Sequence, residues 1–457
     1  MKRAGESTFI PILLCLMLMS GLLGYPGIPH ADYPDMDINA SPHPVGSGAR
    51  AMGMGGAFIS VADDATAASW NPGGLLQLTR PEVSIVGSLF SGRIDHRTSG
   101  LDGDIDDISP QVSHLNYLSA VVPFQLFRRN MVVSLNYQHL YEFSQENVST
   151  WKKVIPSDPT DITQWLYKKQ RGSLSTISPA LAIQVTPSLF IGCTFNIWDH
   201  NLTDTGWENI TIQDETGIEL GEQVRSHSEI FEEFDVSGYN LHLGFLYTSD
   251  YVAFLGNKRR FRIGGVVKTP FNADIRHTKH ELSYVEYPGD PASNTYFEDI
   301  TCSDLTLRMP LSYGMGMSMD WTDAFSCALD VYRTLWERFV MVYPNGVERS
   351  PINRDFMDTA DVTPTTQIRI GAEYLIQDPT RIIPIRIGAF YDPEPARGRP
   401  DDIYGVTVGS GVSYKGRFSF DCAYQLRFGE KRDVESMGIR GDMTQHFVYA
   451  SIIYYLQ

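Results

Sequence analysis

Apolar side chains alternate with small or polar ones in short segments over most of this chain. From Arg417 to Phe428 the even positions carry Phe, Phe, Cys, Tyr, Leu and Phe, whereas the odd positions carry Arg, Ser, Asp, Ala, Gln and Arg. A period of two is that of a β-strand with one apolar face, and about ten residues let a tilted strand cross a bilayer. The alternation therefore predicts an all-β chain whose strands present one face to lipid.

The alternating segments are joined by connections of two lengths. Short connections hold turn residues such as Thr186-Pro187, and nearly every intervening one is long and polar, such as 202–234. Short turns on one rim and long loops on the other are typical of outer-membrane barrels. We expect a transmembrane antiparallel β-barrel of about 14 strands over residues 81–457, with both chain ends at the short-turn rim. The expected strands are 82–91, 113–124, 130–143, 171–186, 188–201, 235–249, 259–285, 295–320, 324–337, 365–376, 381–391, 402–414, 416–428 and 444–456.

The first residues predict a secretory signal peptide. Two basic residues precede a mostly apolar run from Phe9 to Leu23, and a stretch rich in Gly and Pro follows. We expect cleavage near Ala31, which makes residues 1–31 the signal peptide. No apolar run of about 18 residues occurs after it, and this excludes a helical membrane protein. We expect the protein in the outer membrane of a Gram-negative-type cell envelope.

Charge and cysteine usage exclude several other classes. The net charge of -17 argues against nucleic acid as a partner. Four cysteines after the signal peptide are widely spaced, with no CxxC or Cys/His grouping, so neither a metal centre nor a disulfide framework is predicted. No nucleophile-elbow motif accompanies the serines and histidines. We therefore expect no enzyme activity and no cofactor.

The segment from Gly48 to Leu75, GARAMGMGGAFISVADDATAASWNPGGL, is dense in glycine and other small residues. It resembles the amino-terminal plug of the FadL/TodX family of outer-membrane transport proteins. The order of parts matches: a Gly-Met-Gly-Gly-Ala-Phe run, then Val-Ala-Asp-Asp-Ala, then an Asn-Pro turn, where the family usually has Asn-Pro-Ala and this chain has Gly73. The resemblance implies that residues 32–80 form a plug in the lumen of the barrel.

The composition of that segment is consistent with a plug that is also a gate. Glycines allow its backbone to pack closely inside a barrel, and Asp63 or Asp64 is expected to cap a short helix that reaches Trp70. A phosphate-binding loop is disfavoured, because the glycines follow no strand and no Lys-Ser/Thr pair is present. The expected plug or gate residues are Gly53, Gly55, Gly56, Asp63, Asp64, Trp70, Asn71 and Pro72.

The resemblance also implies a function. In that family, hydrophobic ligands such as long-chain fatty acids or aromatic hydrocarbons bind among the extracellular loops, reach a pocket near the plug and pass when the plug shifts, with no energy source. Passive uptake of hydrophobic small molecules is therefore expected. An alternative is a PorV-like scaffold that holds secreted proteins at the cell surface, because such members of the same barrel family have a similar plug motif.

The alternation places charged residues on the inner face of the barrel. The simpler interpretation is a lattice of ion pairs that supports the barrel and anchors the plug. The more specific interpretation is that one of these residues binds a substrate carboxylate, which requires an unpaired Arg beside an apolar pocket. Glu373 and Arg386 are expected to be cross-strand neighbours across a short turn. The expected lumen charges are Asp330, Arg369, Glu373, Arg386, Arg417, Asp421 and Arg427, with Arg260, Arg262 and Lys268 on the seventh strand.

Three prolines within the expected strands indicate irregularities. Pro179 is a candidate for a kink that opens the wall to the bilayer, as in FadL-like proteins, although a plain bulge is the simpler interpretation. Pro270 and Pro310 lie opposite each other in the long hairpin, where they indicate bulges or the membrane boundary.

Two further segments suggest partners. The last strand is similar to the terminal signal that barrel assembly machinery reads, although either its Phe447 face or its Val448 face could point outward. The first long loop carries Asp102, Asp104, Asp106 and Asp107 without the Gly and Glu that an EF-hand needs. We expect a solvated acidic loop there, which divalent ions could bridge weakly to lipopolysaccharide at the cell surface.

Overall fold

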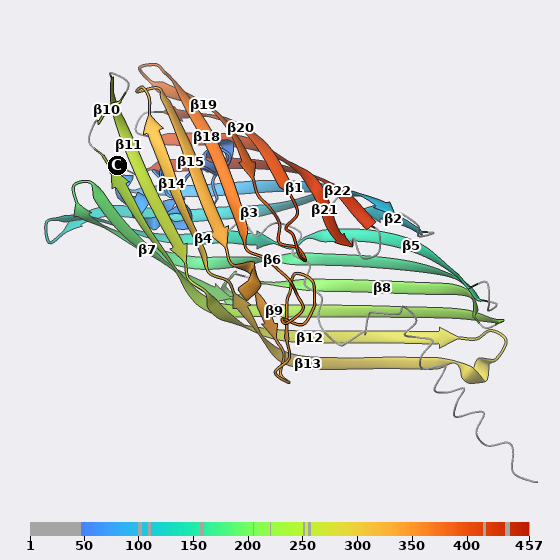
Figure 1. Cartoon of the computed structure of the whole chain (residues 1–457). Coiled ribbons are helices and arrows are strands. Elements are labelled where there is room, and N and C mark those ends of the chain that lie inside the picture. Colours follow the sequence, from blue (N-terminus) through green and yellow to red (C-terminus); the bar gives the residue numbers. More distant parts are fainter. Residues whose placement is uncertain are drawn as a thin grey trace, which may run out of the picture. The chain divides into compact units, whose positions relative to one another are not determined.

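The computed structural model describes residues 47–98, 103–107, 111–155, 160–203, 205–219, 221–249, 252–254, 257–414, 417–434 and 439–456. Their strands join into one sheet of 22 named strands (Figure 1). The helices are short: α2 (Ala49–Gly53), α3 (Ala67–Trp70), α4 (His200–Thr203), and the 3-10 helices η1 (Pro72–Gln77), η2 (Pro291–Ser293) and η3 (Trp336–Arg338). Within this part of the chain, no helix is long and apolar enough to cross a membrane.

Fourteen of the strands form a closed antiparallel barrel, as predicted. The ring closes where β1 pairs with β22, from Glu82↔Tyr455 to Thr98↔Ile439. In ring order the strands are β1 (Glu82–Thr98), β3 (Gln111–Leu126), β4 (Arg129–Glu142), β6 (Thr160–Thr186), β7 (Leu189–Asp199), β9 (Glu222–Thr248), β11 (Asn257–Lys268), β14 (Ser312–Asp320), β15 (Phe325–Thr334), β18 (Thr365–Gln377), β19 (Arg381–Tyr391), β20 (Ile403–Tyr414), β21 (Phe418–Val434) and β22 (Ile439–Tyr455).

Tight turns join the strands at one rim of the barrel, and short polar side chains stabilise them. The Thr186 hydroxyl accepts a hydrogen bond from the N–H of Leu189 (3.0 Å), and Thr322 accepts one from Phe325 (2.9 Å). Thr and Asp favour turns because their side chains bond to nearby backbone groups. The turn between β3 and β4 instead places Phe127 in the left-handed region (φ 51).

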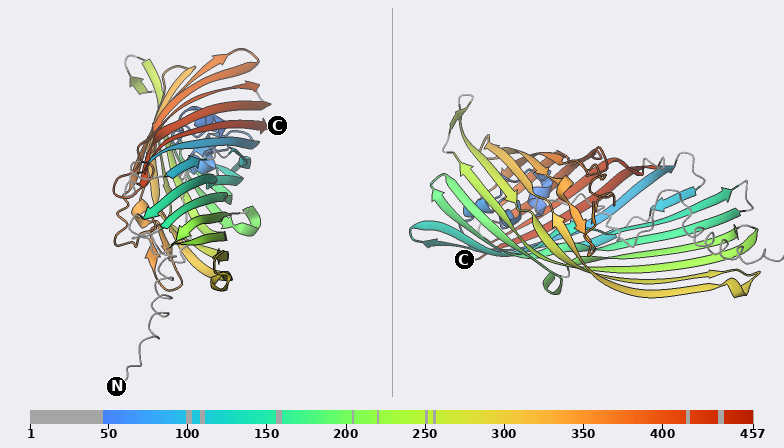
Figure 2. Two further views of the ribbon diagram at one scale, coloured as in Figure 1. Left: turned by 90° about the vertical axis from the view of Figure 1, so that its right-hand side faces the viewer. Right: turned by 60° about the horizontal axis from the view of Figure 1, so that its bottom comes forward.

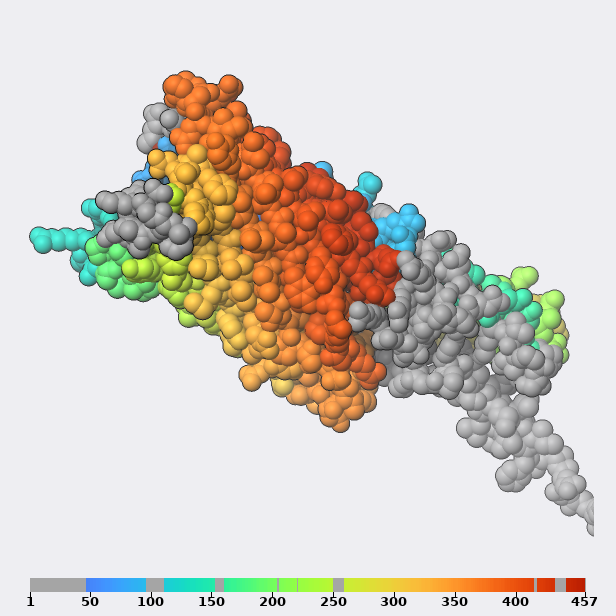
Figure 3. Space-filling model, turned by 45° about the horizontal axis from the view of Figure 1, so that its top comes forward, coloured from blue at the N-terminus to red at the C-terminus, as the bar shows by residue number. Residues whose placement is uncertain are grey.

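The apolar face of each barrel strand points outward. In β21, Phe418, Phe420 and Tyr424 are exposed, whereas Ser419 and Asp421 are buried, as the alternation predicted. The structure also decides the last strand, since Val448, Ile452 and Tyr454 are exposed while Phe447 and its face are buried. Figure 3 shows this outer wall over the orange and red strands.

Aromatic side chains gather near both ends of the outer wall. Tyr404 lies between Tyr391 and Phe428, with ring centroids 5.3 and 6.3 Å away. At the other end of the same strand, Tyr414 lies 4.9 Å from Phe418. Two such girdles, with aliphatic residues between them, are typical of barrels in membranes.

Beyond the barrel the same sheet continues as a group of strands, here called the extension (Figure 2). Its order is β2–β5–β6–β8–β9–β12–β13, so β6 and β9, each 27 residues long, belong to both parts. Short strands β10 (Val252–Phe254), β16 (Val340–Val342) and β17 (Glu348–Arg349) attach to β11, β13 and β16. The other strands of the extension are β2 (Gly103–Asp107), β5 (Gln145–Ile155), β8 (Gly206–Glu219), β12 (Phe271–Glu286) and β13 (Thr295–Met309).

The expected strands 259–285 and 295–320 were each wrong as single strands. Each divides at its proline, into β11 and β12 at Pro270 and into β13 and β14 at Pro310. The two prolines lie opposite each other, between the pairs Lys268↔Ser312 and Phe271↔Met309. Since proline has no N–H to donate, the ladder stops there, and the barrel gives way to the extension.

The region around Pro179 is a local gap in one ladder. The pairing of β6 with β7 stops at Ile177↔Ile197 and resumes at Ala180↔Thr194 without a change of register. On its other side, Pro179 remains paired with Leu135 of β4. Whether this gap opens to the bilayer stays a prediction. The expectation of a solvated acidic loop at Asp102, Asp104, Asp106 and Asp107 concerns side chains that lie outside the described residues.

The cost of a charged residue on the outer wall depends on its depth in the bilayer, and this tests where the membrane lies. Val408 points outward midway along β20, and Tyr404 lies in an aromatic girdle of the same strand. Val408→Arg should lower the free energy of unfolding by about 2 to 4 kcal/mol, whereas Tyr404→Arg should cost about 0 to 1 kcal/mol. Urea unfolding in lipid vesicles measures both, with Val408→Leu as the apolar control. Equal costs at the two positions would show that the bilayer is placed wrongly.

Candidate functional site

Residues Ser47 to Leu78, here called the inner segment, pack against the inner faces of barrel strands and are drawn in blue in Figure 2. The segment contains α2, α3 and η1, and nearly all of its residues are buried. Phe58 and Trp70 pack edge to face, with ring centroids 5.9 Å apart. The cluster of buried apolar side chains in the core belongs mainly to this segment, because the inner faces of the strands are small and polar.

Glycines of the barrel wall let the backbone of the inner segment approach closely. A Cβ added at Gly388 would overlap the backbone of Met54 and Gly55, and one at Gly371 would overlap Met54. Gly55 itself has φ +67, and its own Cβ would lie 2.9 Å from the carbonyl oxygen of Ile370. Any larger side chain at these positions would push the segment from the wall. The wall glycines in such contact are Gly192, Gly244, Gly264, Gly371, Gly388 and Gly409.

Polar side chains of the wall bind the backbone of the inner segment. The Asp330 carboxylate accepts hydrogen bonds from the N–H groups of Phe58 (2.6 Å) and Ile59 (2.8 Å). The Thr407 hydroxyl donates to the carbonyl of Gly53 (3.0 Å). Further bonds run from Tyr117, Thr194, Ser318 and Arg369 to the carbonyls of Ala65, Ala68, Ser60 and Gly55. The segment is therefore held from several sides of the ring.

Asn71 holds the Asn-Pro turn of the inner segment. Its amide nitrogen donates to the carbonyls of Ile59 and of Phe245 in β9, both at 2.8 Å. Its oxygen accepts a bond from the N–H of Gly73 at the start of η1 (3.1 Å). Pro72 follows at the first position of η1, where its missing N–H costs nothing. The turn is thus fixed both to the segment and to the wall.

The two aspartates of the segment differ in role. Asp63 pairs with Arg50. The residue at the N-cap of α3 is Thr66, so the expectation that an aspartate caps this helix was wrong. Asp64 instead accepts bonds from the Thr66 N–H (2.9 Å) and hydroxyl (2.6 Å), which form a turn just before the helix.

Charged residues in the lumen form a lattice of buried ion pairs. Arg386 donates to Glu373 and to Asp421, both at 2.6 Å, so the predicted cross-strand pair is confirmed. Glu373 also accepts from Arg50 of the inner segment (2.9 Å), which in turn pairs with Asp63. Because removal of one partner leaves a buried charge, this chain of contacts ties α2 to the wall.

A second group of buried charges lies beside the first. Arg369 pairs with Asp392 (3.2 Å), and Arg427 pairs with Glu394 (3.2 Å), which also binds Lys431. Asp392 and Glu394 follow β19 in a loop, where alternation gives no information, and sequence reasoning therefore missed both.

One of the expected lumen charges lies elsewhere. Arg417 is exposed in the turn before β21, so its placement in the lumen was wrong; its backbone carbonyl accepts a bond from the N–H of Tyr455. Alternation fails at Arg417 because strand periodicity does not extend into the turn. Arg260 has the same parity as Arg262 and lies opposite Asp320 in the ladder of β11 and β14, but it is exposed near the start of β11.

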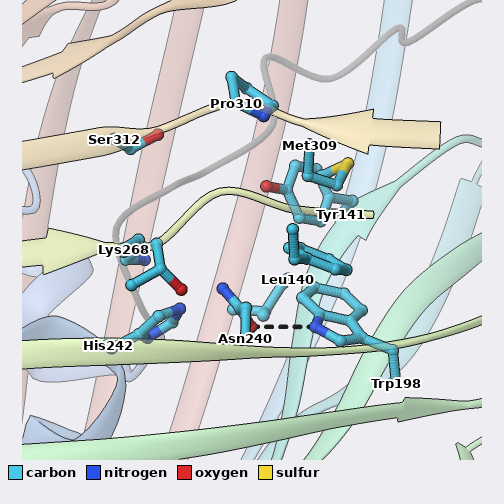
Figure 4. A pocket seen from close by; sticks show the side chains of 11 residues that line it. Leu140, Tyr141, Trp198, Asn240, His242, Lys268, Met309, Pro310 and Ser312 are labelled. Carbon is cyan, nitrogen blue, oxygen red and sulfur yellow. Dashed lines mark hydrogen bonds between the residues drawn. The ribbon is translucent and has the colours of Figure 1, made fainter. Parts of the chain in front are cut away.

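A small pocket opens where the ladder between β9 and its neighbours is broken. Pairing with β11 ends at Lys268↔His242, and pairing with β12 begins at Asp274↔Ser237. At this break Thr269 donates its backbone N–H to the carbonyl of Leu241 in β9 (2.9 Å), and its hydroxyl, in place of a carbonyl, accepts a bond from the N–H of Leu241 (3.0 Å). The pocket is lined by Leu140, Tyr141, Trp198, Asn240, His242, Lys268, Thr269, Phe271, Met309, Pro310 and Ser312 (Figure 4).

The pocket has an apolar wall and a polar end. Trp198 donates its indole N–H to Asn240 (3.0 Å; Figure 4). The Trp198 ring also stacks on Phe271, with centroids 5.4 Å apart. At the polar end are His242 and Lys268, a cross-strand pair of buried residues. Within the described part of the chain, Lys268 forms no ion pair, and its ammonium lies 5.9 Å from the ring centroid of Tyr332. A cation beside apolar walls suits an amphipathic anion.

Aromatic side chains also form a row in the extension. Trp207 of β8 stacks on Phe234 of β9, and Phe234 stacks on His277 of β12, with centroids 4.5 Å apart in both pairs. Phe143 meets the edge of Trp207 at 5.4 Å. Phe143 follows Tyr141 of the pocket by two residues, so the aromatic row and the pocket share one end of β4.

No family model matches the chain, and no curated protein matches it in sequence. Its fold matches solved structures. A Pseudomonas aeruginosa FadL homologue superposes with a TM-score of 0.58 and 13% identity, over 93% of this chain and 99% of that one. The Pseudomonas putida toluene transporter TodX gives 0.52 and 14%, over 93% and 100%. The monoaromatic hydrocarbon channel CymD gives 0.53 and 14%, over 91% and 98%.

The matches cover the barrel and the extension together, so the fold of this chain is that of the FadL/TodX outer-membrane channels. At 12 to 14% identity a shared fold does not carry over residue roles. The roles must be argued from the side chains of this chain.

The close approach at the wall predicts the effect of a bulky residue there. Gly388→Leu should push the inner segment from β19 while the barrel still closes, because ring pairing does not depend on the segment. We expect larger ion conductance in planar bilayers and faster protease cleavage within residues 47–78. Ile387→Leu, one residue away on the outer face, is the matched control. Unchanged conductance and cleavage in Gly388→Leu would contradict the packing.

Proposed function

We propose that this protein is an outer-membrane channel for the passive uptake of hydrophobic small molecules, with the inner segment as its gate. The pocket carries the proposal: it combines apolar walls with a buried Lys268 that forms no ion pair with the residues the structure describes. The fold it shares with hydrocarbon channels supports the same reading. Long-chain fatty acids and aromatic hydrocarbons are the candidate ligand classes.

The pocket favours fatty acids over neutral hydrocarbons. An ammonium buried without an ion pair is costly, and a ligand carboxylate would compensate its charge. The alkyl chain would then lie along Trp198 and Phe271. Because the pocket is small, the ligand must displace side chains at its wall.

The part of the inner segment that moves in gating is the part with fewer charged contacts. The α2 half is held by Arg50, Asp330 and Arg369. The half that ends in η1 is held to the wall by neutral bonds that involve Tyr117, Thr194 and Asn71, and η1 lies beside β6, β7 and β9. Displacing a neutral bond costs less than separating buried charges. We therefore assign the gate movement to η1 and its turn.

Charge removal at the pocket separates the two ligand classes. Lys268→Met should lower uptake of a labelled long-chain fatty acid by about tenfold, equivalent to about 1.4 kcal/mol, and leave uptake of toluene unchanged. Proteoliposome uptake assays measure both ligands. Lys169→Met in the extension, whose lysine pairs with Glu146, is the control. Equal loss for fatty acid and toluene would mean that Lys268 serves structure rather than ligand binding.

Deletion of the inner segment tests the gate. Without residues 47–78 the barrel should still insert, because its backbone is paired around the ring. Its small and polar inner face would then line water, so a polar dye should leak through the variant but not through the intact protein. An inserted variant that stays impermeable to dye would reject the gate.

The scaffold alternative is favoured by one observation. The outer edge of β13 forms no ladder from Thr295 to Leu305 among the described residues, and Tyr296, Phe297 and Ile300 are exposed there. An exposed strand edge with apolar side chains is a docking surface for another chain. Secreted proteins that co-purify with the intact protein and are lost in Ile300→Lys, together with absent hydrophobic uptake, would select the scaffold.

A further inference from the structure

Three side chains that commonly bind metals meet between β3 and β4. His114 Nε2 lies 2.6 Å from Glu142 Oε2, and His139 Nε2 lies 3.2 Å from the same oxygen. The two imidazole rings stack with centroids 4.6 Å apart. The three potential ligand atoms lie within 4.8 Å of one another. Sequence reasoning predicted no metal site, because it found no CxxC or Cys/His grouping.

The cluster lies where the ladder between these strands has ended. The last pair is Tyr117↔Gln138, although β3 begins at Gln111 and β4 continues to Glu142. At this level β3 pairs with β1, and β4 pairs with β6. Side chains rather than backbone bonds therefore connect β3 to β4 here.

Surrounding groups orient the cluster. His139 Nδ1 lies 3.4 Å from the hydroxyl oxygen of Ser175, which also accepts a bond from Tyr137 (3.0 Å). The N–H of Ser144 donates to the other oxygen of Glu142 (2.9 Å). A ligating histidine characteristically donates its second ring N–H to such a partner, which turns the first nitrogen to the metal.

The contacts within the cluster are close but poorly aligned as hydrogen bonds. His114 Nε2 and Glu142 Oε2 are buried, and neither forms a directed hydrogen bond within the described residues, despite their closeness. Buried polar atoms normally have a well-aligned partner. Two atoms bound to one Zn²⁺ with bonds of about 2.0 to 2.2 Å are about 3 to 3.5 Å apart in a tetrahedral site. The separations of 2.6 and 3.2 Å require only small side-chain shifts.

We propose that His114, His139 and Glu142 bind one divalent transition-metal ion of the Zn²⁺ class. Two imidazoles and one carboxylate suit such an ion, whereas Ca²⁺ and Mg²⁺ prefer all-oxygen sites. Three protein ligands leave a position for water. The ion links β3 to β4 at the level where their backbones are not paired.

The test uses full-length protein without a polyhistidine tag, in detergent micelles. Co²⁺ is titrated and followed by its visible absorption, and Zn²⁺ is then added as a competitor. The wild type should bind one Co²⁺ per chain, displaced by Zn²⁺. His139→Ala and Glu142→Gln should weaken binding at least about tenfold, and His446→Ala, which removes a histidine bonded to Tyr424, should not.

Ser175→Ala is the second variant, for the case that a ligand variant does not fold. It keeps all three ligands and the backbone bonds of Ser175 to Thr205, and it removes only the hydroxyl that orients His139. We expect affinity to fall about 10- to 100-fold. Co²⁺ binding that is equal in the wild type, His139→Ala and Ser175→Ala, or absent from the wild type, would overturn the proposal.

Discussion

Closure of the ring between β1 and β22 is the constraint on which the other features depend. In a bilayer each backbone N–H and C=O must find a partner within the protein, and an open sheet edge would leave a row of them unpaired. The long ladder from Glu82↔Tyr455 to Thr98↔Ile439 removes both edges at once. With the backbone satisfied by the ring itself, the outer side chains are free to be apolar, and the inner ones are free to serve other purposes.

The inner face uses that freedom to hold a segment rather than to form a conventional core. Glycines such as Gly371 and Gly388 give room for its backbone, and buried charges such as Asp330 and Glu373 fix its position. The small residues and the charges act together, because the close approach of the segment to the wall brings its backbone within hydrogen-bonding distance of wall side chains. The apolar interior of the protein consequently belongs to the inner segment, with Phe58 and Trp70 at its centre.

The sequence predicted the barrel well because the period of two shows which face of each strand meets lipid. It also placed Glu373 beside Arg386, since a short turn leaves little choice of register. The prediction failed outside the strands, where the period of two does not apply. Arg417 lies in a turn, and Asp392 and Glu394 lie in a loop. Outside a strand, an odd or even position does not predict whether a side chain points inward or outward. The pocket and the His/Glu cluster depend on which distant strands become neighbours, and no local pattern encodes this.

Both candidate binding sites lie at interruptions of the ladder, and this has a physical reason. Where two strands are fully paired, the wall is filled by backbone bonds, and side chains point only inward or outward. Where pairing stops, as after Tyr117↔Gln138 and between Lys268↔His242 and Asp274↔Ser237, the space between the strands must be filled by side chains. Polar side chains do this best because they satisfy backbone groups left unpaired, as Thr269 does. Such side chains can also bind a carboxylate or a metal ion, so in a closed barrel chemistry concentrates where the ladder is broken.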